Sequence, residues 1–166
     1  ADPGGGRGAI FASDVCPSKP EGMQYILKVL GEEFDWAADL KPRSMWIWPY
    51  DSGGCGCAEC QPWGSKGFMK CVKEVGKLAR EKMPGTKIFL STWFIKGSEW
   101  SGIKEQLARD KGLVDGIVSE PGPHGLAIAP EDHGLPMIGF PEISMHGTFP
   151  WGGFGATPLT ARARKK

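Results

Sequence analysis

Short apolar runs alternate with segments of helical periodicity along this chain, and that alternation limits the folds open to it. Apolar runs predict strands at 9–12, 45–48, 87–92, 114–118 and 137–140. Segments of helical spacing separate the first four runs and begin near Ser18, Ser65 and Ser98. Short strands that are apolar throughout are typical of a parallel sheet covered on both faces. We therefore predict an α/β fold of parallel strand-helix repeats.

The predicted helices have recognisable starts and stops. Ser18 is expected to cap the first helix, with Glu21 three residues later as in a capping box and Pro20 in the first turn. The second helix is expected over 65–83, where Pro84 and Gly85 end it. A third helix is expected to run from Ser98 to Gly112.

The length indicates one domain and an incomplete barrel. The chain has 166 residues, 40% of them hydrophobic, which is enough for one sizeable core. Residues 1–8 resemble a glycine-rich cloning remnant, and 160–166 form a basic tail, so the domain is expected over 9–159. A complete (β/α)₈ barrel needs about 200 to 250 residues. We therefore expect a truncated, partial (β/α) barrel of about five strands.

An open sheet of this kind has edge strands that must be covered. We expect at least one edge to pair with a second copy of the chain, giving a homo-oligomer, or to be overlaid by residues 141–159. Other partners are disfavoured by charge and hydropathy. Twenty basic and nineteen acidic residues leave a net charge of +1, and no apolar stretch has the length of a membrane span. The sequence predicts neither a nucleic-acid nor a membrane partner.

Carboxylates follow three of the predicted strands: Asp51 the second, Glu120 the fourth and Glu142 the fifth. In such folds ligands bind at the carboxyl ends of the strands. Paired carboxylates are what a glycosidase uses, one as acid and the other as nucleophile or base. The alternative is that these acids only cap or solvate loops. Aromatic and histidine side chains near the same ends could hold a sugar, namely Trp48, Tyr50, Trp93, His146 and Trp151, with Trp63 beside them.

Four cysteines are closely spaced: Cys55, Cys57 and Cys60, followed by Cys71 on the second predicted helix. Their thiols could hold a structural zinc ion, form disulfides, or stay free, and the spacing does not decide among the three. Cys16 is left over. The loop over 50–64 is so rich in glycine that we expect a metal or a covalent bond to order it.

Several segments carry a resemblance to a known group of proteins. They are Cys16-Pro-Ser-Lys-Pro-Glu-Gly22, Trp48-Pro-Tyr-Asp-Ser-Gly-Gly-Cys-Gly-Cys-Ala-Glu-Cys-Gln-Pro-Trp-Gly64, Leu90-Ser-Thr-Trp93, Phe140-Pro-Glu-Ile-Ser-Met145 and Pro150-Trp-Gly-Gly-Phe-Gly155. Together they resemble bacterial glycoside-hydrolase-like proteins with a TIM-barrel catalytic domain, over about 8–159. The resemblance implies a carbohydrate-processing fold and points to Asp51 and Glu142 as site residues.

Two classes of function follow from these patterns. The first is a glycosidase, or a sugar-binding protein on the same scaffold, acting on a carbohydrate through Asp51, Glu142 and the weaker candidate Glu120. The second is a non-catalytic module stabilised by metal or disulfides that assembles through an open sheet edge. Carboxyl groups between about 5 and 9.5 Å apart in one cleft would favour the enzyme.

Overall fold

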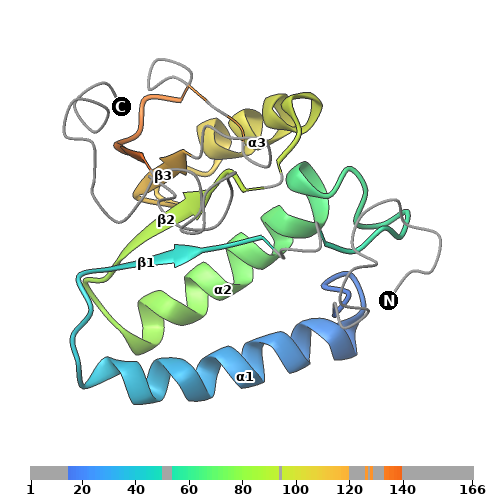
Figure 1. Cartoon of the computed structure of the whole chain (residues 1–166). Coiled ribbons are helices and arrows are strands. Elements are labelled where there is room, and N and C mark those ends of the chain that lie inside the picture. The colour runs from blue at the N-terminus through green and yellow to red at the C-terminus, as the bar shows by residue number, and fades with distance from the viewer. Residues whose placement is uncertain are drawn as a thin grey trace, which may run out of the picture.

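Strands and helices alternate in the structure as they do in the sequence pattern (Figure 1). The computed structural model describes residues 15–49, 54–93, 95–119, 126, 128 and 133–139. In chain order the elements are α1 (Pro20–Ala38), β1 (Ser44–Ile47), the π-helical segment η1 (Gly64–Phe68), α2 (Met69–Lys82), β2 (Lys87–Ser91), α3 (Gly97–Arg109), β3 (Gly116–Ser119) and β4 (Met137–Gly139). The predicted strand at 9–12 lies outside the described residues.

The strands form one parallel sheet in the order β1-β2-β3-β4. Trp46 of β1 is level with Phe89 of β2, which is level with Gly116 of β3. The predicted α/β fold of parallel strand-helix repeats is therefore confirmed. Because neighbours in the sheet are also neighbours in sequence, the winding continues in one direction, as it does in a (β/α) barrel. The predicted edge pairing by residues 141–159 concerns a part of the chain that is not described.

The core lies between the sheet and the helices. Gly76 of α2 sits over the strands, and a Cβ there would meet Ile88 at 3.7 Å and Ile47 at 3.9 Å. Helix α2 also packs along α1, and η1 packs against α3 (Figure 1). The fully buried side chains of this core are Cys60, Trp63, Phe68, Val72, Ala79, Ile88, Leu90, Ile103 and Ile117. Burial of these apolar groups supplies the main driving force for the fold.

The start of α1 departs from the sequence pattern, and the start of α3 is held by a buried carboxylate. The predicted cap at Ser18 is wrong: α1 has Lys19 at its N-cap position with no side-chain cap bond, although Pro20 is in the first turn. The Ser18 hydroxyl instead contacts Cys60 and Lys70. In α3 the carboxylate of Glu99 accepts hydrogen bonds from the N–H groups of Lys96 and Gly64, at 2.8 and 3.0 Å. This buried carboxylate ties the start of α3 to the start of η1.

Asp115 organises the amino ends of the strands. Its carboxylate accepts hydrogen bonds from the backbone N–H of Ile88 at 2.9 Å, from Lys87 at 3.1 Å and from Arg80 at 3.2 Å. Burial opposes ionisation of Asp115, but these three partners together hold the pKa of its carboxyl below the ordinary value. The Arg80 guanidinium also donates to the carbonyls that follow α3, so one ion-pair network joins α2 to the β2–β3 pair.

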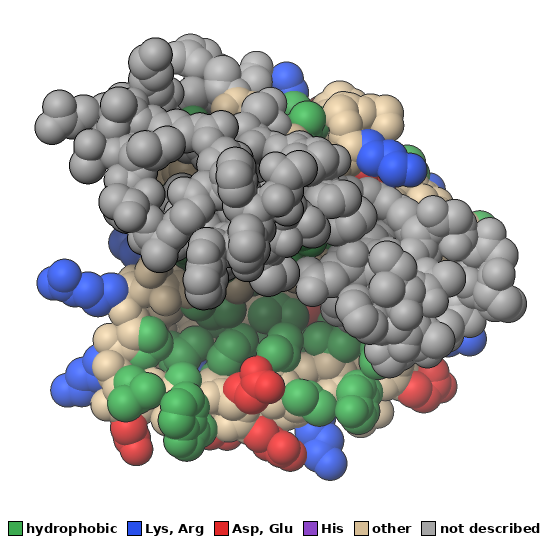
Figure 2. Space-filling view, in the orientation of Figure 1, with side chains coloured by type: hydrophobic (Ala, Val, Ile, Leu, Met, Phe, Trp, Pro, Cys, Tyr) green, Lys and Arg blue, Asp and Glu red, His purple; other side chains and the backbone are tan. Residues whose placement is uncertain are grey.

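Hydrophobic side chains also reach the surface. Figure 2 shows them gathered over α1 on the face of the molecule that it presents. The large exposed ones on α1 and in the turn after it are Tyr25, Trp36 and Leu40, of which Trp36 is 74% exposed. Within the described part of the chain, no helix has both the length and the apolar character needed to cross a membrane.

Candidate metal centre

Four cysteine thiols meet in one place. The Sγ atoms of Cys16, Cys55, Cys57 and Cys60 all lie within 4.8 Å of one another. Cys16 Sγ is 3.7 Å from the Sγ atoms of both Cys57 and Cys60. Zinc bound tetrahedrally by thiolates at about 2.3 Å holds its sulfurs about 3.8 Å apart. The spacing of these thiols therefore fits one tetrahedral metal ion.

Two segments far apart in the sequence supply the thiols. Cys16 lies in the turn before α1, where its carbonyl accepts the N–H of Lys19. A Cβ at Gly22 would lie 2.1 Å from that same carbonyl oxygen, so glycine is needed for the turn to fold back on the helix. Figure 1 places the start of α1 and the segment after β1 at the same end of the molecule, where the strands end.

The other three thiols lie in a turn that backbone bonds hold. The carbonyl of Cys57 accepts the N–H groups of Cys60 and Gln61, both at 3.0 Å. The side-chain amide of Gln61 donates to the carbonyl of Cys55 at 2.8 Å. These bonds curl the chain so that Cys55, Cys57 and Cys60 point to one centre.

Trp63 packs the cysteine loop, residues 54–64, against the apolar core. Its side chain is 0% exposed. A Cβ at Gly54 would lie 2.0 Å from its ring, and one at Gly67 would lie 2.5 Å from it, so the indole packs directly on two glycine backbones. Trp63 is therefore not available as a sugar platform, which corrects the expectation from its place in the sequence. This packing holds the described part of the loop, residues 54–64, against the core.

Cys71 does not belong to the thiol group, which corrects its assignment as the fourth ligand. It lies on α2 and is 7% exposed. The fourth thiol beside Cys55, Cys57 and Cys60 is that of Cys16. Burial raises the pKa of the Cys71 thiol to about 12, so it stays protonated at neutral pH. All five cysteines are free thiols, so the structure contains none of the disulfides that the spacing left open.

The environment of Cys57 favours its thiolate more than that of Cys55 or Cys60 does. Burial opposes its ionisation, but hydrogen bonds from Cys55, Cys60 and Cys16 lower its pKa to about 7. Burial raises the pKa of Cys55 to about 11 and also raises that of Cys60. The Cys57 thiolate is thus accessible near neutral pH, whereas the thiols of Cys55 and Cys60 require a bound cation to lose their protons.

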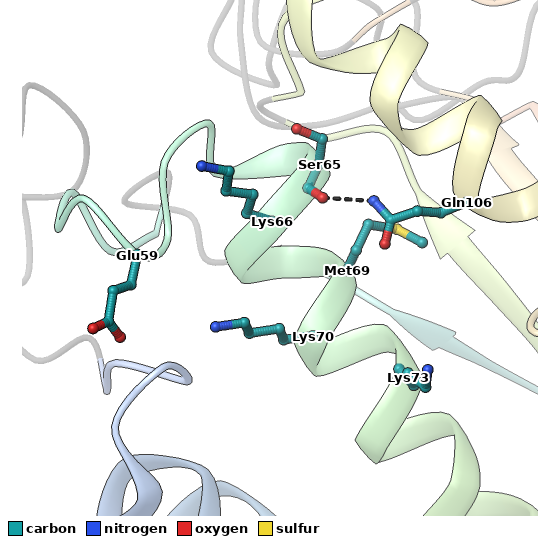
Figure 3. Close-up of a pocket in the computed structure, with 7 residues that line it drawn as sticks. All are labelled: Glu59, Ser65, Lys66, Met69, Lys70, Lys73 and Gln106. Carbon is teal, nitrogen blue, oxygen red and sulfur yellow. Dashed lines mark hydrogen bonds between the residues drawn. The ribbon is translucent and has the colours of Figure 1, made fainter.

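Two polar side chains adjoin the thiols. Ser18 Oγ is 3.1 Å from Cys60 Sγ, and Lys70 Nζ donates to Ser18 Oγ at 2.8 Å. Lys70 also lines a pocket of about 500 Å³ beside the cysteine loop (Figure 3). Figure 3 shows Glu59 on the opposite side of this space from Lys66 and Lys70. The pocket is lined by Glu59, Ser65, Lys66, Met69, Lys70, Lys73 and Gln106.

Tryptophans form a second cluster at the carboxyl ends of the strands. Trp48 directly follows β1 and Trp93 comes two residues after β2. Their ring centroids are 5.7 Å apart with a tilt of 39°, and Trp46 stacks on Trp48 at 6.2 Å. Trp48 and Trp93, both predicted to bind substrate, are thus brought together and partly exposed.

The remaining predicted site residues lie outside the described part of the chain. They are Tyr50, Asp51, Glu120, Glu142, His146 and Trp151. The separation of Asp51 from Glu142, on which the glycosidase prediction depends, therefore stays a prediction.

Comparisons of the chain with protein-family profiles, with curated proteins and with solved structures found no match. The thiol geometry is thus the strongest pointer to function. Sequence reasoning missed Cys16 as part of it. A signal was present, however, since Cys16 and the Cys55–Cys60 turn each follow one of two successive predicted strands, whose carboxyl ends should be neighbours.

Proposed function

We propose that the chain is a zinc-binding α/β domain in which Cys16, Cys55, Cys57 and Cys60 hold one ion. The main support is that these four Sγ atoms lie within 4.8 Å of one another although they come from two separate segments. Four protein thiolates would fill a tetrahedral shell and leave no position for water or substrate. That arrangement is typical of a structural rather than a catalytic zinc site.

The donor set favours zinc among the common metals. Magnesium and calcium prefer oxygen ligands, and this group offers sulfur alone. A single iron or a copper(I) ion is the chemical alternative for a sulfur-only site. Zinc bound here would join the turn before α1 to the loop after β1, which is a structural task.

The test measures metal content and ligand identity together. The protein is purified under reducing conditions, dialysed, and analysed for metal by elemental analysis and native mass spectrometry. We expect one zinc per chain, and a cobalt-substituted form with the strong visible absorption of tetrahedral cobalt thiolate. Cys16→Ser should lose this spectrum, and Cys71→Ser, the matched control, should keep it.

Two results would contradict the metal centre itself. One is a wild-type protein that binds no metal under these conditions. The other is a Cys71→Ser variant that loses the cobalt spectrum as fully as Cys16→Ser does. A coloured protein that contains iron instead of zinc would refute the choice of metal.

A second function is favoured by the tryptophan cluster: carbohydrate binding or hydrolysis at the carboxyl ends of the strands. The partly exposed pair of Trp48 and Trp93 supports it, because indole rings pack on the apolar faces of sugar rings. The resemblance noted for the Trp48–Gly64 segment implies the same function, although the comparisons matched no family. Asp51 and Glu142 would then supply the paired carboxylates, with Glu120 as the weaker candidate.

A panel of aryl glycosides and oligosaccharides tests this second function. We expect Trp48→Ala and Trp93→Ala to weaken sugar binding at least tenfold. Trp36→Ala should leave it unchanged, because Trp36 lies near the end of α1 and is not part of the tryptophan cluster. Turnover, if observed, should fall 100-fold or more in Asp51→Asn and Glu142→Gln, about the range that acid-base catalysis supplies. Equal sugar binding by all three tryptophan variants would refute the role of the cluster.

A further inference from the structure

A chain of hydrogen bonds leads from a lysine to one of the four clustered thiols. Lys70 Nζ is 2.8 Å from Ser18 Oγ, which is 3.1 Å from Cys60 Sγ. The three residues come from the first turns of α2, from the turn before α1, and from the cysteine loop. Ser18 makes this contact in place of the helix cap expected of it.

The chemistry of the three groups fixes the direction of both bonds. An ammonium group only donates, so the Ser18 oxygen accepts from Lys70. The single hydroxyl proton of Ser18 is then free to point at Cys60. A metal-bound thiolate has no proton and only accepts, so the hydroxyl must be the donor to its sulfur.

Cys60 needs such a donor more than an exposed thiolate would. Its side chain is 0% exposed, so water cannot solvate the sulfur. One zinc ion with four thiolates carries two net negative charges, and a buried charge without compensation is costly. Lys70 brings a positive charge to this cluster through Ser18.

We propose that Ser18 and Lys70 are positioning residues of the metal centre: the hydroxyl orients and stabilises the Cys60 thiolate, and the lysine acts on it through that hydroxyl. This inference rests on the proposed zinc function and adds the groups that set its affinity. Partners that hydrogen-bond to metal ligands typically change metal affinity about 10- to 100-fold.

The experiment measures zinc affinity by competition with a chromophoric chelator. We expect Ser18→Ala to bind zinc about 10- to 100-fold more weakly, and Lys70→Met to bind it several-fold more weakly. Because the lysine acts through the hydroxyl, the double variant should be no worse than Ser18→Ala alone. Ser18→Thr, which keeps the hydroxyl, should restore most of the affinity.

A matched lysine and a change of salt separate this role from a general loss of charge or stability. Lys73→Met removes another lysine of the same pocket and should leave zinc affinity unchanged. Raising the salt concentration should weaken zinc binding more in wild type than in Lys70→Met, because salt screens the lysine charge.

The outcomes distinguish this inference from the function beneath it. A wild-type protein without zinc affinity refutes the metal centre itself. Zinc binding that is equal in Ser18→Ala, Lys70→Met and Lys73→Met leaves the centre intact and overturns the role of Ser18 and Lys70. Fully additive losses in the double variant would also overturn it, because the lysine would then act independently of the serine.

Discussion

Removing Cys16 should cost the domain most of the stability that zinc confers. Cys16 and Cys60 are 44 residues apart in sequence, so an ion bound by both closes a long loop. At a free concentration about 1,000 times its dissociation constant, zinc would stabilise the folded domain by about 4 kcal/mol, because only the folded chain holds the assembled site. For a chain of this size, each kcal/mol shifts the unfolding temperature by about 2 to 4 °C. We therefore expect zinc to raise the midpoint of wild type by about 8 to 16 °C and that of Cys16→Ser by much less.

Thermal unfolding followed by circular dichroism, with and without a fixed concentration of free zinc, measures this increment. A reductant that does not bind metal is present throughout, so that no disulfide replaces the ion. Cys71→Ser is the control: its intrinsic stability falls because the side chain is buried, but its zinc-dependent increment should equal that of wild type. A zinc increment in Cys16→Ser as large as in wild type would refute the assignment of Cys16 as a zinc ligand.

Two further predictions concern the packing around the site and the opposite end of the sheet. Gly67→Ala should destabilise the protein by about 1 to 3 kcal/mol in chemical unfolding, because the new Cβ would lie 2.5 Å from the Trp63 ring, whereas Gly97→Ala, with no atom within 4 Å, should not. Asp115→Asn should cost about 1 to 3 kcal/mol at neutral pH. The pKa of Asp115 is lowered in the folded protein, so the stabilisation from its carboxylate is complete above the unfolded pKa of about 3.9 and is lost as pH falls through the folded pKa. Urea unfolding at several pH values should therefore show that the stability of Asp115→Asn depends less on acid than that of wild type. An acid dependence equal to that of wild type would contradict this account.

The order of strands and helices could be predicted because it depends on local periodicity. The apolar run at 87–92 and the helical spacing over 65–83 reappear as β2 and as η1 with α2. Two details depended on contacts that are distant in sequence. The Ser18 hydroxyl turned to Cys60 instead of capping α1, and the π-helical start of the second helix follows the buried Trp63.

The site was predicted only as far as its residues are close in sequence. Cys55, Cys57 and Cys60 form one turn, so their spacing sufficed to place them together. Cys71 follows soon afterwards in sequence but lies on a helix, whereas Cys16 reaches the site across the length of α1. Likewise, nothing in the sequence distinguishes the buried Trp63 from the partly exposed Trp93; the difference comes from the glycine backbones that enclose Trp63.

The proposed metal centre and the tryptophan cluster can coexist in one domain because both lie in segments that follow strands of the same parallel sheet. Parallel strands in sequential order bring the segments after each strand to one end of the sheet. The chain that leaves β1 first presents Trp48 beside Trp93 and then enters the cysteine loop. A zinc ion held by four thiolates has no open position for substrate, so its chemical contribution ends with holding that loop in place. Any reaction at this end would therefore be carried out by protein side chains, and the metal would influence it only through the position of the loop.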